Sequence, residues 1–116
     1  MTMIDNKIPV LAAPMQGVTD NVWRMAQHSV FGGVDAYYAP FMRVEHGEIR
    51  RKDLRDVDPE RNSGLNLVPQ ILACQSSHAL IMVNALKQMG YRRIDINLGC
   101  PFPPIALHRK GSGMLA

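Results

Sequence analysis

A cysteine stands between a glycine and a proline in Gly99-Cys100-Pro101, a sequence typical of a chain reversal. A free cysteine thiol titrates at about pH 8.5 and is mostly protonated at neutral pH. Such a thiol can act as a general acid, giving its proton to one carbon while a hydride arrives at the neighbouring carbon. A cysteine in this turn can equally be inert, and spacing alone leaves both interpretations open.

Two amide side chains are expected near the ends of strands, where they can meet a ligand. In residues 94–97 the two isoleucines share one face, and Asp95 and Asn97 share the other, because side chains alternate along a strand. We expect the apolar face to meet helices and the polar face to point inward, with Asn97 nearest the mouth of the site. Gln70 and Val68 form a similar inward pair. These amides can hydrogen-bond the edge of a planar heterocycle, or they can only cap loop backbone.

Strands that alternate with helices must position these residues. The apolar stretches expected as strands are residues 8–13, 34–39, 67–72 and 94–97. Pro69 argues that the third strand is not fully hydrogen-bonded along both edges. Alternation with helices implies parallel pairing through right-handed crossovers. The sequence therefore predicts an α/β fold with its polar groups at the carboxyl ends of the strands, where such folds bind ligands.

Two helices are expected between these strands. Thr19 can cap the first, whose apolar residues recur at helical spacing: Val22, Trp23, Ala26 and Val30. Ser76 or Ser77 can cap the second, which is expected to end at Gly90. The apolar face of this second helix is expected to hold Ala79, Met82, Val83, Leu86 and Met89. The stretch 99–113, with three prolines and three glycines, is expected to be a loop.

Charge is unevenly distributed along the chain, whose net charge is +3. Residues 43–66 are expected to form a long polar loop with at most a short hairpin or helix. Within it, residues 43–62 hold six basic and six acidic side chains, which cancel. Residues 87–110 hold five basic side chains against Asp95 alone. This excess suits a polyphosphate partner such as RNA, or a solvated basic surface with no partner.

The sequence gives little support for a metal site, a membrane span or secretion. The histidines are scattered and there is no Cys-x-x-Cys pair, so no metal site is predicted. Cys74 is expected to be structural. No apolar run is long enough to span a membrane, and residues 1–7 lack the pattern of a signal peptide. With only two cysteines, a cytoplasmic protein with reduced thiols is predicted.

Three motifs, in order, resemble the signatures of the tRNA-dihydrouridine synthase family. They are Ala-Pro-Met-Gln-Gly-Val-Thr-Asp at 13–20, Pro-Gln-Ile at 69–71, and Asp-Ile-Asn-Leu-Gly-Cys-Pro at 95–101 followed by Gly-Ser-Gly-Met-Leu at 111–115. The resemblance implies a (β/α)8 TIM barrel that binds FMN and uses NADPH to reduce the C5–C6 double bond of uridine in tRNA. Many members carry a lysine where Pro104 stands.

The resemblance also implies roles for single residues. Three consecutive residues would lie against the flavin: Pro14, Met15 and Gln16. Gln70 would hydrogen-bond the isoalloxazine ring, and Asn97 would contact the target uracil. Cys100 would be the general acid that protonates C5. The target base must leave the tRNA stack to reach such a site.

The length of the chain limits this expectation. An eight-stranded barrel needs about 250 residues, whereas this chain has 116. We therefore expect residues 1–116 to be the amino-terminal part of an FMN-binding barrel, without its carboxyl half and without the family's helical tRNA-binding domain. Such a chain is expected to be inactive alone and prone to self-association through its open sheet.

Two alternatives remain at this point. Another FMN barrel reductase, of the dihydroorotate dehydrogenase type, also carries an Asn-x-x-Cys-Pro turn. A non-catalytic RNA-binding fragment would account for the basic residues of 87–110 without any flavin. Salt-dependent tRNA binding in the absence of flavin would favour this second alternative.

Overall fold

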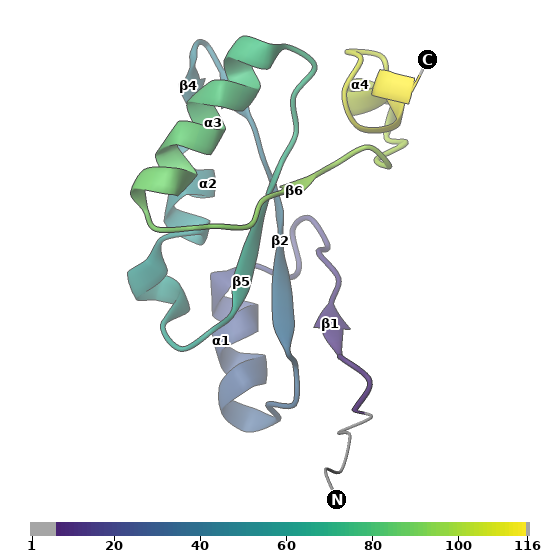
Figure 1. Cartoon of the computed structure of the whole chain (residues 1–116). Coiled ribbons are helices and arrows are strands. Elements are labelled where there is room, and N and C mark those ends of the chain that lie inside the picture. Colours follow the sequence, from purple (N-terminus) through teal and green to yellow (C-terminus); the bar gives the residue numbers. More distant parts are fainter. Residues whose placement is uncertain (1–6, 116) are drawn as a thin grey trace, which may run out of the picture.

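Four parallel strands curl into half of a barrel, with helices along one face, in the computed structural model of the chain (Figure 1). The structure describes residues 7–115. The segment considered for a signal peptide therefore lies, except for Lys7, outside the described residues, as does Ala116. The predicted α/β architecture of an incomplete TIM barrel is confirmed. Within residues 7–115, no helix is long and apolar enough to cross a membrane.

The sheet has the order β1-β2-β5-β6, and every neighbouring pair is parallel. Its strands are β1 (Leu11–Ala12), β2 (Ala36–Met42), β5 (Leu67–Ile71) and β6 (Asp95–Ile96). The first strand is shorter than expected because the backbone N–H of Val10 bonds the Asp35 carboxylate, at 2.7 Å, instead of a neighbouring strand. The second strand runs further than expected, through Pro40.

The expected irregularity at Pro69 is present. Tyr38 pairs with Val68 and Phe41 pairs with Gln70, so β2 has one more residue than β5 between these two pairs. Pro69, which has no N–H to donate, lies at this register shift. The missing N–H of Pro69 therefore falls where the regular hydrogen-bond ladder between β2 and β5 is interrupted.

The cap positions of the two long helices differ by one or two residues from those that the sequence predicted. Helix α1 (Asn21–Val30) is capped by Asp20, whose carboxylate accepts the N–H of Trp23 at 2.9 Å. Thr19 does not cap it, because its hydroxyl oxygen accepts the N–H of Met15 at 2.8 Å. Helix α3 (Ser76–Gln88) has Gln75 at its cap position and no side-chain cap bond, so the prediction of a serine cap is wrong.

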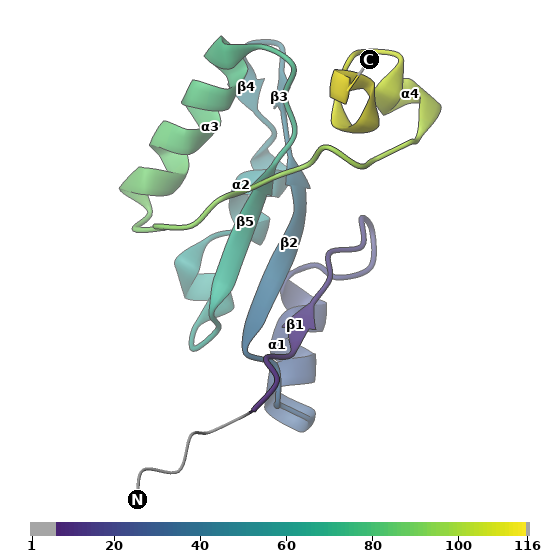
Figure 2. The same ribbon diagram turned by 45° about the vertical axis from the view of Figure 1, so that its right-hand side comes forward.

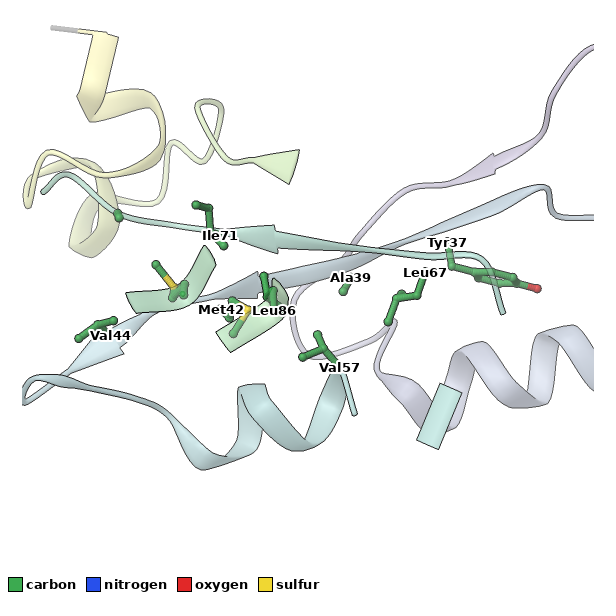
Figure 3. Close-up of a cluster of buried hydrophobic side chains, with 10 residues drawn as sticks. Tyr37, Ala39, Met42, Val44, Val57, Leu67, Ile71 and Leu86 are labelled. Carbon is green, nitrogen blue, oxygen red and sulfur yellow. The ribbon is translucent and has the colours of Figure 1, made fainter. Parts of the chain in front are cut away.

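The apolar core lies between the sheet and the helices (Figure 3). Helix α3 contributes Met82 and Leu86, while Ala79, Val83 and Met89 pack at its margin, as the periodicity predicted. Gly90, with φ +95°, ends this turn in the left-handed region that favours glycine. The remaining buried members come from the strands and the segments beside them: Tyr37, Ala39, Met42, Val44, Val57, Leu67, Ile71 and Ala73.

The polar stretch 43–66, expected as a long loop with at most a short hairpin or helix, contains both. It contains the hairpin β3 (Val44–Glu45) and β4 (Glu48–Ile49), then helix α2 (Arg51–Asp56) and the 3-10 turn η1 (Pro59–Asn62). Asp53 organises it: its carboxylate accepts two bonds from the Arg50 guanidinium, at 2.7 and 3.0 Å, and one from the backbone N–H of Arg43, at 3.1 Å. Nearby, burial raises the pKa of Tyr91 to about 12, and its hydroxyl donates to the carbonyl of Val57.

The prediction that residues 99–113 form a loop is wrong. They contain helix α4 (Pro103–Ala106) and most of the 3-10 turn η2 (Gly111–Leu115). Pro103 and Pro104 stand in the first turn of α4, where a missing N–H leaves no helical bond unmade. Figure 2 shows α4 at the same end of the sheet as the β3–β4 hairpin.

Part of the apolar surface is not covered by this chain. The apolar residues of α1 are exposed, including Val22 and Val30, and Arg24 is the residue that this helix buries. Ile96, expected to face the helices, is 57% exposed. The radius of gyration is 15.5 Å, whereas a closed domain of this length has about 13 Å. The open sheet accounts for the difference.

Candidate functional site

Three polar side chains from two strands are hydrogen-bonded in series at the carboxyl end of the sheet. Gln70 Nε2 donates to a carboxylate oxygen of Asp95 at 2.7 Å, and Asn97 Nδ2 donates to Gln70 Oε1 at 3.0 Å. Leu67 and Ile71 face the helices, so Gln70 points to the other face of β5. The predicted inward face formed by Gln70, Asp95 and Asn97 is therefore confirmed.

The carboxylate sets the direction of this series. An ionised carboxylate only accepts hydrogen bonds, so Gln70 must turn its amide nitrogen toward Asp95 and its oxygen toward Asn97. The Asn97 oxygen then accepts the backbone N–H groups of Gly99, at 3.2 Å, and Cys100, at 3.0 Å. Asn97 thus caps the loop and keeps one N–H to offer. Gln70 keeps one N–H and one lone pair.

The Cys100 turn is held from both sides. Its N–H is bonded to Asn97, and its carbonyl accepts the N–H of Ser112 at 3.0 Å. Gly111, with φ +55°, packs so closely that a Cβ there would lie 2.8 Å from the Cys100 oxygen. A Cβ on Gly113 would lie 2.1 Å from the carbonyl oxygen of Ala106. The Gly-Ser-Gly motif therefore fixes η2 against the half-buried Cys100.

The turn after β1 forms a second group of candidate residues. The carbonyl of Met15 accepts the N–H groups of Val18 and Thr19, both at 3.0 Å. The side chain of Met15 is 59% exposed. Pro14 is half-buried, and Gln16 lines a hollow of about 210 Å³ together with Phe41. Strand β2 separates this turn from the Gln70 series, and no hydrogen bond between described residues joins the two groups.

Comparison with known proteins bears on this arrangement. A family model described as dihydrouridine synthase matches residues 10–116, which include every candidate residue above. The chain belongs to the dihydrouridine synthase family. This membership separates it from the dihydroorotate dehydrogenase alternative.

Relatives within the dihydrouridine synthase family are similar over nearly the whole chain. The tRNA-dihydrouridine(16) synthase of Neisseria meningitidis serogroup B is 31% identical over 117 residues, covering 94% of this chain and 34% of its own length. The enzyme of the same name from Ralstonia nicotianae is 32% identical over 113 residues, covering 92% of this chain and 34% of its own length. The chain thus spans about a third of the length of these relatives. No solved structure matches it.

Sequence reasoning missed the most buried polar residue of this dihydrouridine synthase chain. Arg24 is fully buried, and its guanidinium donates to the Thr19 carbonyl at 2.8 Å and to the Asp56 carbonyl at 2.7 Å. It also donates to the side-chain oxygen of Asn62, at 2.9 and 3.2 Å, and to the Asp56 carboxylate, at 3.2 Å. An arginine between Trp23 and Met25 was the available signal. Arg24 ties the end of the β1–α1 turn to α2 and η1.

Two further expectations for the family site need correction. Cys74 is exposed rather than packed in the core. The basic residues of 87–110, expected to suit one polyphosphate partner, do not lie in one place, because Lys87, Arg92 and Arg93 lie before β6, at its amino end, whereas Arg109 and Lys110 follow α4. Among the described residues, no cluster of three or more histidine, cysteine, aspartate or glutamate side chains could hold a metal ion.

Proposed function

We propose that this chain supplies part of the active site of an enzyme that reduces the C5–C6 double bond of uridine in tRNA, with FMN as cofactor and NADPH as hydride donor. The observation that carries the proposal is the series Asp95–Gln70–Asn97, which ends on the backbone of Cys100. It stands at the carboxyl end of a parallel sheet, where barrel enzymes bind ligands, in a chain of the dihydrouridine synthase family.

The residues present fit a flavin. The amide of Gln70 keeps one donor and one acceptor, which match the alternating N–H and carbonyl groups on the pyrimidine edge of the ring system. The exposed side chain of Met15 offers an apolar surface beside Pro14 and Gln16. These four residues would hold the ring. When bound in its reduced form, FMN supplies the hydride for C6 of the uracil.

The chain's own groups would orient the base and supply the proton. Because the Asn97 oxygen is occupied by two backbone N–H groups, Asn97 presents only an N–H outward, and this N–H suits a carbonyl oxygen of uracil. The Cys100 thiol would give its proton to C5, so that one hydride and one proton convert the double bond to a single bond. Its partial exposure lets water return a proton to the thiolate.

The proposal assigns the rest of the site to other residues of a full-length family member. Four strands do not close a barrel, so the 116 residues alone are proposed to be inactive. Their exposed apolar side chains are proposed to favour self-association. We retain the cytoplasm as the proposed location, and tRNA as the partner.

The flavin content of the protein purified from its complete gene tests this proposal. We expect an FMN absorption band in the visible range, and we expect Gln70→Leu to weaken FMN binding by about 5- to 150-fold, the loss of roughly 1–3 kcal/mol for polar groups left unpaired. Gln88→Leu, on the exposed surface of α3, serves as the control and should keep the flavin. A colourless wild-type protein, or equal flavin content in the Gln70 variant, would contradict the proposal.

A further inference from the structure

Helix α2 exposes three cations and turns its two carboxylates inward. Arg51, Lys52 and Arg55 are exposed, whereas Asp53 is buried and Asp56 is half-buried. With 3.6 residues per turn, the three cations fall within an arc of about 100° around the helix. One face of α2 is therefore basic.

The two carboxylates of α2 lie outside this arc, and both are held in ion pairs with other arginines. Asp53 pairs with Arg50 at 2.7 Å. Asp56 pairs with Arg24 at 3.2 Å and accepts the backbone N–H of Asn21 at 2.6 Å. The described residues form no ion pair with the three exposed cations.

The acids on neighbouring segments are partly occupied as well. Glu45 pairs with Arg43 at 2.5 Å, and the carboxylate of Asp58 caps the backbone N–H of Glu60 at 3.0 Å. Glu48 and Glu60 are exposed on the hairpin and on η1. The formal neutrality of residues 43–62 thus conceals a positive surface, since four of their six acidic side chains are held in ion pairs or hydrogen bonds.

This surface borders the candidate site. Lys52 and Arg55 line the hollow of about 210 Å³ together with Gln16 and Phe41. Asp20, Asp53 and Asp56 line it as well, and each of these carboxylates is bonded to another residue. Phe41 is the register partner of Gln70 across the sheet. Lys52 and Arg55 therefore lie close to the turn after β1, which the proposed function places against the flavin.

We propose that Arg51, Lys52 and Arg55 bind the phosphate backbone of the RNA strand that delivers the target base. The inference rests on the proposed function, which makes RNA the substrate, and adds the surface that holds it. Arginine and lysine are the side chains that neutralise phosphates, each contact releasing counterions. Lys87, Arg92 and Arg93 carry the same charge at the opposite end of the sheet and have no part in this binding.

Two matched triple variants of the protein purified from its complete gene test the proposal by fluorescence anisotropy of labelled bulk tRNA over a series of salt concentrations. One carries Arg51→Gln, Lys52→Gln and Arg55→Gln, and the other carries Lys87→Gln, Arg92→Gln and Arg93→Gln. Each removes three positive charges, so the change in total charge is the same in both variants. All six positions are exposed, and circular dichroism verifies that both variants fold.

The α2 variant is expected to lose about 2 to 3 from the slope of log affinity against log salt, and at least tenfold in affinity at low salt. The Lys87 variant should retain the slope of the wild type. Equal losses in both variants, an unchanged α2 variant, or no tRNA binding by the wild-type protein would overturn the proposal. Flavin content is measured in parallel. RNA binding through α2 by a protein without flavin would support this inference and contradict the proposed function. Bound flavin without α2-dependent RNA binding would support the proposed function and contradict this inference.

Discussion

Replacing Cys100 with alanine is expected to lower the rate of uridine reduction by about 10²- to 10⁴-fold, the usual contribution of a positioned general acid. The alanine variant has no proton to give to C5, while its backbone can still hold the bonds to Asn97 and Ser112. The measurement is single-turnover formation of dihydrouridine in tRNA by the protein from the complete gene, at fixed flavin content.

The second cysteine provides the control for this prediction. Cys74 is also free and lies on the exposed surface after β5, so Cys74→Ala should turn over at nearly the wild-type rate. A Cys100→Ala protein that keeps its flavin and reduces tRNA within a factor of about three of wild type would rule out Cys100 as the proton donor.

Replacing Arg24 with methionine is expected to destabilise the fold by about 3–5 kcal/mol, since one partner of a buried charged network is removed. The change leaves the Asp56 carboxylate without its cation and leaves the Asn62 side-chain oxygen without the two bonds it accepts from Arg24. The free energy of unfolding of a small domain is only about 5–15 kcal/mol. Much of the native population would therefore be lost. Urea unfolding followed by circular dichroism gives the free energy of unfolding.

Arg55→Met is the matched control for Arg24→Met. Arg55 is exposed on α2 and forms no ion pair with the described residues, and substitutions of this kind usually change stability by less than about 0.5 kcal/mol. If both methionine variants unfolded at the same urea concentration as wild type, the Arg24 network would be shown to contribute nothing to stability.

Local periodicity was enough to predict the parts of the fold that depend on neighbours along the chain. The alternation in residues 94–97 placed Asp95 and Asn97 on one face, and the spacing in α3 identified Met82 and Leu86 as core residues. Pro69 marked the register shift, because a residue without an N–H cannot complete a ladder. These predictions needed only the period of a strand or a helix.

Features that depend on contacts distant in sequence were not predicted. The charges of residues 43–62 cancel in a count, yet the structure buries Asp53 and pairs Asp56 with Arg24, which lies 32 residues away. The apolar residues of α1 recur at helical spacing, but the described residues leave Val22, Trp23 and Val30 exposed. The tail after Cys100 looked like a loop from its prolines, which instead begin α4.

In the candidate site, too, the sequence predicted which residues lie together but not the contacts between them. Gln70, Asn97 and Cys100 were expected near one another from their places after the strands. The direction of the hydrogen bonds was not predicted. It depends on the contact between Gln70 on β5 and the Asp95 carboxylate on the adjacent strand β6. The role of Gly111 against Cys100 also required the folded chain.

The dihydrouridine content of tRNA, measured by nucleoside mass spectrometry, tests the central claim most directly. The gene that encodes these residues is deleted, then restored as wild type or as Cys100→Ala. We predict that deletion lowers the dihydrouridine content, that the wild-type gene restores it, and that the Cys100→Ala gene does not. Unchanged dihydrouridine after deletion, or full restoration by Cys100→Ala, would contradict the account.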